Sequence, residues 1–170
     1  MKRITITAFL LFVAVVGFCQ KTVESTKEFT VTGLVDKPVT ISYTDIEKEK
    51  ITSIGDFKIT NHLGEFKKEY KNVKGVLLLN LLKNINITST SPKLLSEYYF
   101  VFKASDGYSV VVSWNELFNT EIGNSFYVVV EANNQSQKDA PEKILLIPAK
   151  DFKTGRRHIK GLQNIEVKRI

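Results

Sequence analysis

The chain has 170 residues, a formal net charge of +6 and one cysteine, Cys19. This length is enough for a single domain with a core that is stable by itself. A chain with one cysteine forms no internal disulfide, and no thiolate is available downstream of Cys19 for metal binding or catalysis. The positive excess is modest and favours acidic partners only weakly.

The N-terminus has the organisation of a secretory signal peptide. Lys2 and Arg3 precede an apolar run at residues 8–18. This run is too short to span a bilayer, because a membrane helix needs about 20 apolar residues. We therefore expect a cleavable signal peptide at residues 1–19 and an exported protein, periplasmic or secreted. Removal of Lys2 and Arg3 lowers the net charge from +6 to +4.

The predicted cleavage site follows two small residues, Gly17 and Cys19, so the mature chain begins at Gln20 or Lys21. An alternative is a lipoprotein signal in which Cys19 carries the lipid. This alternative ranks second, because bulky Phe18 stands where such signals usually have a small residue.

The mature part is predicted to be one domain at residues 29–170, preceded by a flexible polar lead-in at residues 20–28. It shows no internal repeat, low-complexity tract or change of composition. Apolar alternation and short apolar runs predict most of the regular structure as strands. The predicted strands are residues 29–35, 39–43, 57–59, 66–70, 98–103, 108–112, 126–130 and 144–147, with a final extended segment at 165–170.

Helices are expected to be few and short. Thr44 with Glu47 and Ser113 with Glu116 have the spacing of a capping box, in which each side chain satisfies the other residue's backbone N–H. An apolar stripe at i, i+3, i+4 and i+7 predicts a third helix over residues 78–85. A mixture of hairpins and capped helices without regular βαβ alternation indicates an α+β fold with mostly antiparallel or mixed sheets.

Asp106 and Gly107 lie between two predicted strands and suit a type I′ turn, which needs positive φ at both central residues. This predicts an antiparallel hairpin of residues 100–104 with 108–112. The stretch at residues 132–142 is polar and is predicted to be a loop.

Basic residues crowd the C-terminal segment, which has two interpretations. It is a solvated face that keeps the protein soluble, or it is an anion-binding site. The residues are Lys150, Lys153, Arg156, Arg157, His158, Lys160, Lys168 and Arg169.

Four segments occur in the order typical of one known family. They are residues 29–46, with strands around Asp36-Lys37-Pro38; Lys74-Gly75-Val76-Leu77, before a leucine-rich helix; Ala104-Ser105-Asp106-Gly107-Tyr108, with the helix behind it; and residues 145–167, with Gly155-Arg156-Arg157-His158-Ile159-Lys160. In these segments the chain resembles the oxidoreductase molybdopterin-binding domain of the sulfite oxidase-like superfamily. The resemblance implies that α+β fold over nearly the whole mature chain.

Members of that family hold molybdenum through a cysteine thiolate, whereas the matching neighbourhood here reads Ile59-Thr60-Asn61-His62. Threonine and asparagine do not replace a soft anionic sulfur ligand. The family's arginine before Pro148 is matched by Ile144. The resemblance therefore implies a member without sulfite oxidase-type catalysis.

Binding of molybdopterin, the one candidate cofactor, is still open, because a pterin phosphate requires only cationic side chains and backbone N–H groups. The candidate cofactor-binding residues are Thr60, Asn61, His62, Arg156, Arg157, His158 and Lys160.

Three functions follow from this comparison. The first is a non-catalytic exported protein that binds a small anionic ligand or a partner protein. The second is a periplasmic molybdopterin-dependent oxidoreductase with an unconventional metal site, and the third is a structural module with a vestigial pocket. Zinc is disfavoured because His62 and His158, the only histidines, have no ligand at metal spacing. Export disfavours nucleic acid as a partner.

Overall fold

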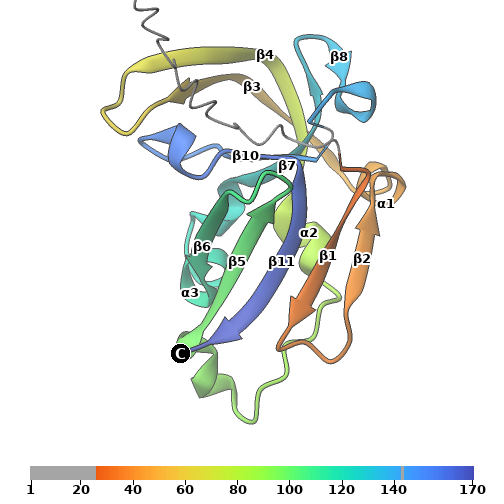
Figure 1. Cartoon of the computed structure of the whole chain (residues 1–170), viewed down its shortest axis with the longest axis vertical. Helices are drawn as coiled ribbons and strands as arrows, with labels where there is room; N and C mark the ends of the chain where they lie inside the picture. The colour runs from red at the N-terminus through yellow and green to blue at the C-terminus, as the bar shows by residue number, and fades with distance from the viewer. Residues whose placement is uncertain (1–25, 143) are drawn as a thin grey trace, which may run out of the picture.

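Two β-sheets face each other across a shared hydrophobic core (Figure 1). The structure, a computed structural model, describes residues 26–142 and 144–170, so the predicted signal peptide lies outside the described residues. The first sheet has the order β2 (Val39–Ser42), β1 (Glu28–Gly33), β11 (Leu162–Arg169), β5 (Tyr98–Ala104) and β6 (Ser109–Ser113). The second has the order β10 (Ile159–Lys160), β9 (Leu145–Pro148), β7 (Phe126–Ala132), β4 (Phe66–Leu77) and β3 (Ile51–Thr60), and β8 (Gln135–Ser136) pairs with β7.

The predicted fold class is confirmed: the fold is α+β, its sheets are mostly antiparallel, and its helices are short. The pairing of β1 with β11 is parallel and makes the first sheet mixed. The α-helices are α1 (Tyr43–Glu47), α2 (Leu78–Leu82) and α3 (Trp114–Phe118). The 3₁₀ helices are η1 (Pro92–Glu97), with six residues, and the three-residue turns η2 (Gly123–Ser125), η3 (Gln137–Asp139) and η4 (Thr154–Arg156).

The capping box at α3 is confirmed. The Glu116 backbone N–H donates to Ser113 Oγ at 3.1 Å, and the Ser113 backbone N–H donates to Glu116 Oε2 at 2.9 Å. The predicted box at the first helix is wrong by two residues, because Ser42 and Asp45 form it. Strand β2 pairs with β1 up to Ser42, so the helix starts where this pairing ends.

The third predicted helix is shorter than its apolar stripe. Helix α2 ends at Leu82, and the Ile85 backbone N–H donates to the Leu82 carbonyl in a turn at 2.9 Å. The chain then bridges from Ile87 to Val35 at the edge of the first sheet. Ile85 still packs against the main core. Ile85 therefore reaches the core through the turn that follows α2, and not through a continuation of the helix.

The β5–β6 hairpin pairs as predicted, with Phe100 opposite Val112, but its turn is not type I′. The Gly107 backbone N–H donates to the Ala104 carbonyl at 3.0 Å, which places Ser105 and Asp106 at the centre of the turn. Gly107 has a φ of 89°. The predicted loop at 132–142 is also partly wrong, since it contains β8 and η3.

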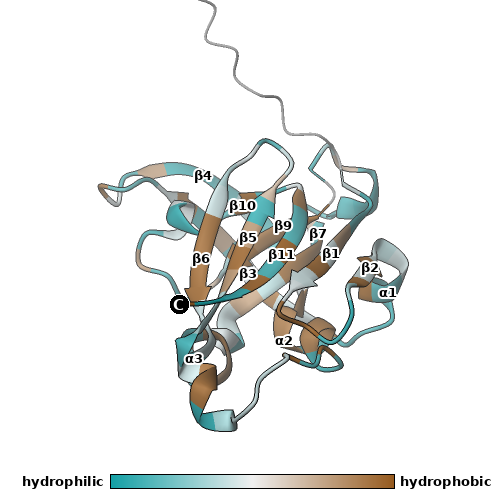
Figure 2. Cartoon of the chain, turned by 60° about the horizontal axis from the view of Figure 1, so that its bottom comes forward, coloured by the Kyte–Doolittle hydropathy of each residue, from teal (hydrophilic) through white to brown (hydrophobic). Residues whose placement is uncertain are grey.

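The main core lies between the two sheets and joins distant parts of the chain. The Phe102 ring of β5 stacks on the Phe126 ring of β7, with centroids 6.1 Å apart and planes 7° apart. Both rings are fully buried. Figure 2 shows hydrophobic colour along β6 and α2 and hydrophilic colour over much of β4. None of the described helices is long and apolar enough to cross a membrane.

The β3–β4 hairpin extends beyond the strands that the alternation predicts, and it is bent. Its register shifts around Gly55, which has a φ of 89°, and Asn72 on the opposite strand has a φ of 51°. Such bulges bend a strand pair. The outer half of the hairpin adds side chains to a second, smaller core that also contains residues of β7 and β9. This core holds Phe57, Ile59, Tyr70, Val73, Val129, Ala132, Leu145 and Ile147.

Gly33 ends β1 at a close approach to β11, and we predict that Gly33→Ala destabilises the protein by about 3 kcal/mol. Its φ is +87°, and a Cβ there would collide with the Val167 carbonyl oxygen. Gly64 has a φ of +90° with open space around it. Gly64→Ala should therefore lower the free energy of unfolding by only about 1 kcal/mol, the cost of a positive φ at alanine. The additional loss in Gly33→Ala reflects the collision of the new Cβ with β11. Urea denaturation measures both variants, and equal losses would contradict the prediction.

Candidate functional site

The basic segment predicted from the sequence forms a loop between β9 and β10, at one end of the second sheet. Pro148 ends β9, and the Ala149 backbone N–H donates to the Ser125 carbonyl at 2.7 Å. The loop then makes the 3₁₀ turn η4, in which the Arg156 backbone N–H donates to the Lys153 carbonyl at 3.0 Å. These backbone bonds give the loop a defined path over the edge of the molecule.

Two threonines tie this loop to the end of β3. The Thr60 backbone N–H donates to Thr154 Oγ1 at 3.0 Å, and the Thr154 backbone N–H donates to Thr60 Oγ1 at 3.2 Å. The Thr154 hydroxyl donates to the Lys58 carbonyl at 2.6 Å. Gly155 follows directly, and a Cβ at this position would collide with the Thr60 carbonyl oxygen. The structure thus brings Thr60 beside the basic loop, but as a structural tie.

Arg157 braces the loop from inside. Its Nε and Nη2 donate to the two carboxylate oxygens of Asp151 at 2.8 and 2.5 Å, and its Nη1 donates to Glu116 Oε1 at 3.2 Å. The guanidinium also lies 5.0 Å from the centroid of the Phe126 ring. Hydrogen bonding to Asp151 raises the pKa of Arg157 above its ordinary value. All of the guanidinium nitrogens are therefore engaged within the fold.

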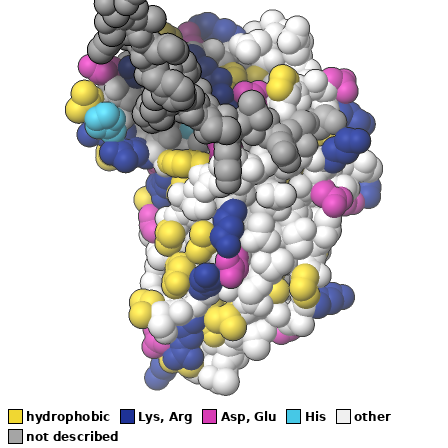
Figure 3. Space-filling view, in the orientation of Figure 1, with side chains coloured by type: hydrophobic (Ala, Val, Ile, Leu, Met, Phe, Trp, Pro, Cys, Tyr) yellow, Lys and Arg dark blue, Asp and Glu magenta, His cyan; other side chains and the backbone are white. Residues whose placement is uncertain are grey.

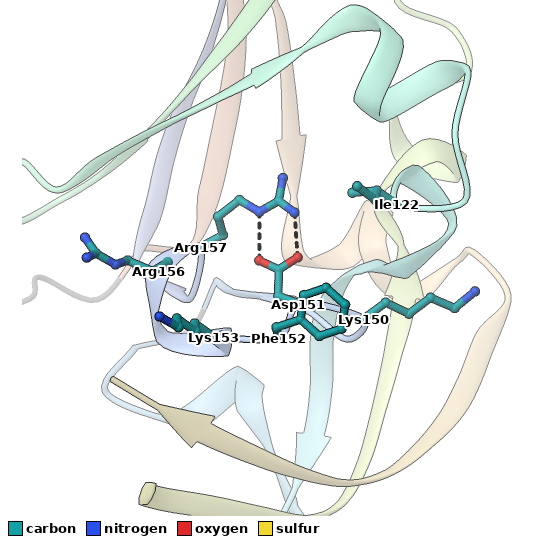
Figure 4. A pocket seen from close by; sticks show the side chains of 7 residues that line it. All are labelled: Ile122, Lys150, Asp151, Phe152, Lys153, Arg156 and Arg157. Carbon is teal, nitrogen blue, oxygen red and sulfur yellow. Dashed lines mark hydrogen bonds and ion pairs between the residues drawn. The ribbon is translucent and has the colours of Figure 1, made fainter. Parts of the chain in front are cut away.

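A surface pocket of about 530 Å³ opens beside this brace (Figure 4). Figure 4 shows Lys153 and Arg156 on one side of the Arg157–Asp151 pair, and Ile122 and Lys150 on the other. The lining residues are Ile122, Lys150, Asp151, Phe152, Lys153, Arg156 and Arg157. Four of these side chains are cationic and only one is anionic, so the pocket has a positive charge excess.

Two cations of the pocket are available for a ligand. Within residues 26–142 and 144–170, neither Lys153 nor Arg156 forms an ion pair, and both side chains are exposed. The Lys150 ammonium lies 3.5 Å from a Glu121 carboxylate oxygen, in a pair open to solvent. Such exposed pairs contribute little to stability and are readily exchanged.

His158 lies on the inner side of the same loop and does not contribute charge. Its Nε2 is 3.3 Å from the Tyr70 hydroxyl. Burial, with Lys68 and Lys160 nearby, lowers the pKa of His158 to about 3. The imidazole is therefore neutral at physiological pH. The Lys160 ammonium pairs with the Glu142 carboxylate at 3.2 Å.

Asn61 and His62 lie in the turn of the β3–β4 hairpin and do not line the pocket. Asn61 Oδ1 accepts hydrogen bonds from the backbone N–H groups of Leu63 and Glu65, both at 3.0 Å. Its Nδ2 donates to the Glu65 carboxylate at 2.7 Å, so the amide is engaged in the turn. His62 is exposed. Of the seven candidate residues, Arg156 and Arg157 line the pocket. Arg157 is engaged by Asp151 and Glu116, whereas the Arg156 side chain has no partner in the part of the chain that the structure describes.

The candidate cofactor-binding residues omitted five of the seven residues that line the pocket, although two of the five, Lys150 and Lys153, were recognised as part of the basic segment. The five are Ile122, Lys150, Asp151, Phe152 and Lys153. A carboxylate between basic residues gives no distinct pattern, and Ile122 comes from a turn 28 positions before Lys150. One sequence feature points to the Asp151–Arg157 ion pair: the two residues stand on either side of Thr154-Gly155, a pair of residue types that is common in turns.

The residues present do not fit a thiolate-held molybdenum. No cysteine occurs after Cys19, and residues 26–142 and 144–170 contain no group of three His, Cys, Asp or Glu side chains arranged to hold a metal. The pocket side chains are mainly cationic, and ammonium and guanidinium groups do not ligate metals.

A comparison with solved structures finds similarity to the sulfane dehydrogenase SoxCD from Paracoccus pantotrophus. The TM-score is 0.58 with 14% sequence identity, and the match covers 87% of this chain and 41% of the SoxCD chain. The chain therefore spans about two fifths of that protein. At this identity the likeness concerns the fold alone. Neither a family model nor a curated protein matches the sequence.

We predict that Arg157→Ala lowers the free energy of unfolding by about 3 kcal/mol. The substitution leaves Asp151, whose side chain is 12% exposed, without its charged partner. Arg156→Ala is the matched control and should change stability by less than about 0.5 kcal/mol, because this side chain is exposed and forms no ion pair within residues 26–142 and 144–170. Chemical denaturation measures both variants. A loss for Arg157→Ala no larger than that of the control would exclude the bracing role.

The neutral His158 predicts an acid-sensitive fold. Its ordinary pKa of 6.5 applies in the unfolded chain, whereas the folded pKa is about 3. Between these values the unfolded chain binds a proton that the folded one does not, so stability falls as the pH falls. The contribution is about 1.4 kcal/mol per pH unit. Urea denaturation at several pH values between 7 and 4.5 gives the free energy of unfolding as a function of pH. In His158→Gln this free energy should fall less steeply with falling pH than in the parent, by about this amount. Identical slopes would contradict the prediction.

Proposed function

We propose that this protein is an exported, non-catalytic protein of the sulfite oxidase-like molybdopterin-domain superfamily that binds a small anionic ligand in the pocket beside η4. The observation that carries the proposal is a pair of exposed cations, Lys153 and Arg156, which line a pocket with a positive charge excess and have no ion-pair partner among the described residues.

The chemistry of the rim suits an anion with several oxygens. A guanidinium donates two parallel hydrogen bonds to phosphate or carboxylate, and an ammonium adds a point charge with three donors. The Arg157–Asp151–Glu116 network holds the loop in place without using the rim cations. The site is therefore organised before a ligand arrives, which lowers the entropy lost on binding.

Membership of the superfamily is supported by the ordered sequence segments and by the fold likeness to SoxCD. A non-catalytic role is supported by the donor set, since no soft sulfur ligand follows Cys19. The alternative of an oxidoreductase would require an unconventional metal site. The alternative of a structural module with a vestigial pocket leaves Lys153 and Arg156, which have no ion-pair partner in the described part of the chain, without a role.

Molybdopterin without metal is one ligand that this site would accept. Its phosphate would meet Lys153 and Arg156, and neither contact needs a thiolate. Export to the periplasm or beyond is supported by Lys2, Arg3 and the apolar run at residues 8–18.

The first test measures binding of inorganic pyrophosphate by calorimetry. We expect Lys153→Ala with Arg156→Ala to weaken binding at least tenfold, because each lost charge-assisted hydrogen bond is worth about 1.5 kcal/mol or more. A double variant of exposed lysines elsewhere, Lys37→Ala with Lys93→Ala, should bind like the parent. Equal affinity of the rim variant and the parent would refute the anion site.

Metal analysis and pterin fluorescence on protein from a host that makes the cofactor complete this test. Pterin without molybdenum supports the binding role and identifies the ligand. Stoichiometric molybdenum with pterin would overturn the non-catalytic role and favour the oxidoreductase. Absence of both, together with pyrophosphate binding, would leave another small anion as the ligand.

A further inference from the structure

Three large apolar side chains protrude from the end of the molecule that carries the basic loop. Phe152 is 100% exposed, Leu63 is 67% exposed and Phe66 is 61% exposed. A single exposed apolar residue is ordinary, but several at one end of a molecule, flanked by basic residues, are the combination found at membrane-binding surfaces. We call these residues, with the cations Lys67, Lys150, Lys153 and Arg156, the hairpin–loop surface.

The two segments of this surface are fixed to each other. The paired hydrogen bonds of Thr60 and Thr154 connect the end of β3 with η4. In Figure 1 the tip of the β3–β4 hairpin lies beside the loop that leads to β10. The hairpin turn is itself ordered, because Asn61 accepts the N–H groups of Leu63 and Glu65. The apolar side chains therefore project from rigid backbone and not from loose ends.

Basic residues surround these protrusions. In Figure 3, yellow hydrophobic and dark-blue basic side chains lie together at the edge formed by the β3–β4 hairpin. The acidic residues of the two segments are already engaged: Asp151 is bound by Arg157, and Glu65 is bound by Asn61 and Lys67. Lys153 and Arg156 have no carboxylate partner among the described residues. The surface thus combines apolar tips with net positive charge.

We propose that the hairpin–loop surface docks on a membrane that contains anionic lipid. Phe152, Leu63 and Phe66 enter the boundary between headgroups and acyl chains, while Lys153 and Arg156 bind headgroup phosphates. This inference rests on the anion-binding role proposed above and identifies the anion as a lipid headgroup. Aromatic and leucine side chains flanked by basic residues are the combination that binds at such interfaces.

The shape of the surface favours a membrane over a protein partner. A protein interface needs a continuous packed core with hydrogen bonds at its rim. Here the apolar side chains stand on separate protrusions with a charged pocket beside them. A fluid lipid surface accommodates such protrusions without a complementary shape, and its headgroups supply the counter-charge.

The test is co-sedimentation of residues 20–170, which include every element that the structure describes, with phosphatidylcholine vesicles that contain or lack phosphatidylglycerol. We expect salt-sensitive binding to the anionic vesicles and at least about tenfold weaker binding to the neutral ones. The triple variant Leu63→Ser, Phe66→Ser, Phe152→Ser should lose about tenfold or more in vesicle affinity. The double variant Leu63→Ser, Phe66→Ser leaves every residue of the pocket lining in place, so it should bind vesicles more weakly yet bind pyrophosphate like the parent. The matched control of the triple variant is Leu34→Ser, Ile51→Ser, Val111→Ser, which changes exposed apolar residues elsewhere.

The outcomes separate this inference from the proposed function. Pyrophosphate binding without vesicle binding overturns the membrane role and leaves the anion site intact. Equal binding to neutral and anionic vesicles, or unchanged binding by the triple variant, also overturns it. If Lys153→Ala with Arg156→Ala binds anionic vesicles like the parent, Lys153 and Arg156 do not bind headgroup phosphates, and that part of the proposal is wrong. Binding to polyglutamate in place of vesicles, with the same dependence on Phe152, would indicate an acidic protein partner instead.

Discussion

The Glu116 carboxylate links two parts of the protein that are remote in the sequence. One of its oxygens completes the capping box of α3 by accepting the Ser113 backbone N–H, and the other accepts from Arg157. Through Arg157 it reaches Asp151, so the helix behind the first sheet is connected with the loop at the end of the second. This connection and the Thr60–Thr154 hydrogen bonds together hold the basic loop and everything that it presents.

This connection also divides the basic residues into two groups. Arg157 is held inside by Asp151 and Glu116, and Lys160 is paired with Glu142, so both serve the fold. Lys153 and Arg156 turn outward and stay unpaired among the described residues. Because a charge already neutralised by close partners has little left for a ligand, only the outward group is suited to binding. The sequence shows a single basic run, whereas the structure gives its members different roles.

The same loop and the β3–β4 hairpin form one rigid end of the molecule. Thr60 and Thr154 exchange hydrogen bonds there, and Gly155 allows the two backbones to approach. The bend of the hairpin around Gly55 brings its outer half over the second core. A pocket with free cations and protruding apolar side chains consequently share one end, which is why anion binding and membrane docking are connected in our proposals.

Local patterns were sufficient where neighbouring residues decide the structure. The sequence by itself predicted the α+β class, the capping box of α3, the β5–β6 pairing and most strands, because these depend on alternation and on contacts three or four residues apart. It misjudged the start of α1, which follows the end of the β1–β2 pairing, and the length of α2, after which the chain forms the Val35–Ile87 bridge. Likewise, only the tertiary structure decided that Asn61 and His62 lie outside the pocket, that His158 is neutral and that Arg156 has no carboxylate partner among the described residues. Burial and ion pairing join residues such as Glu116 and Arg157, which are 41 positions apart, and no local pattern encodes such a contact.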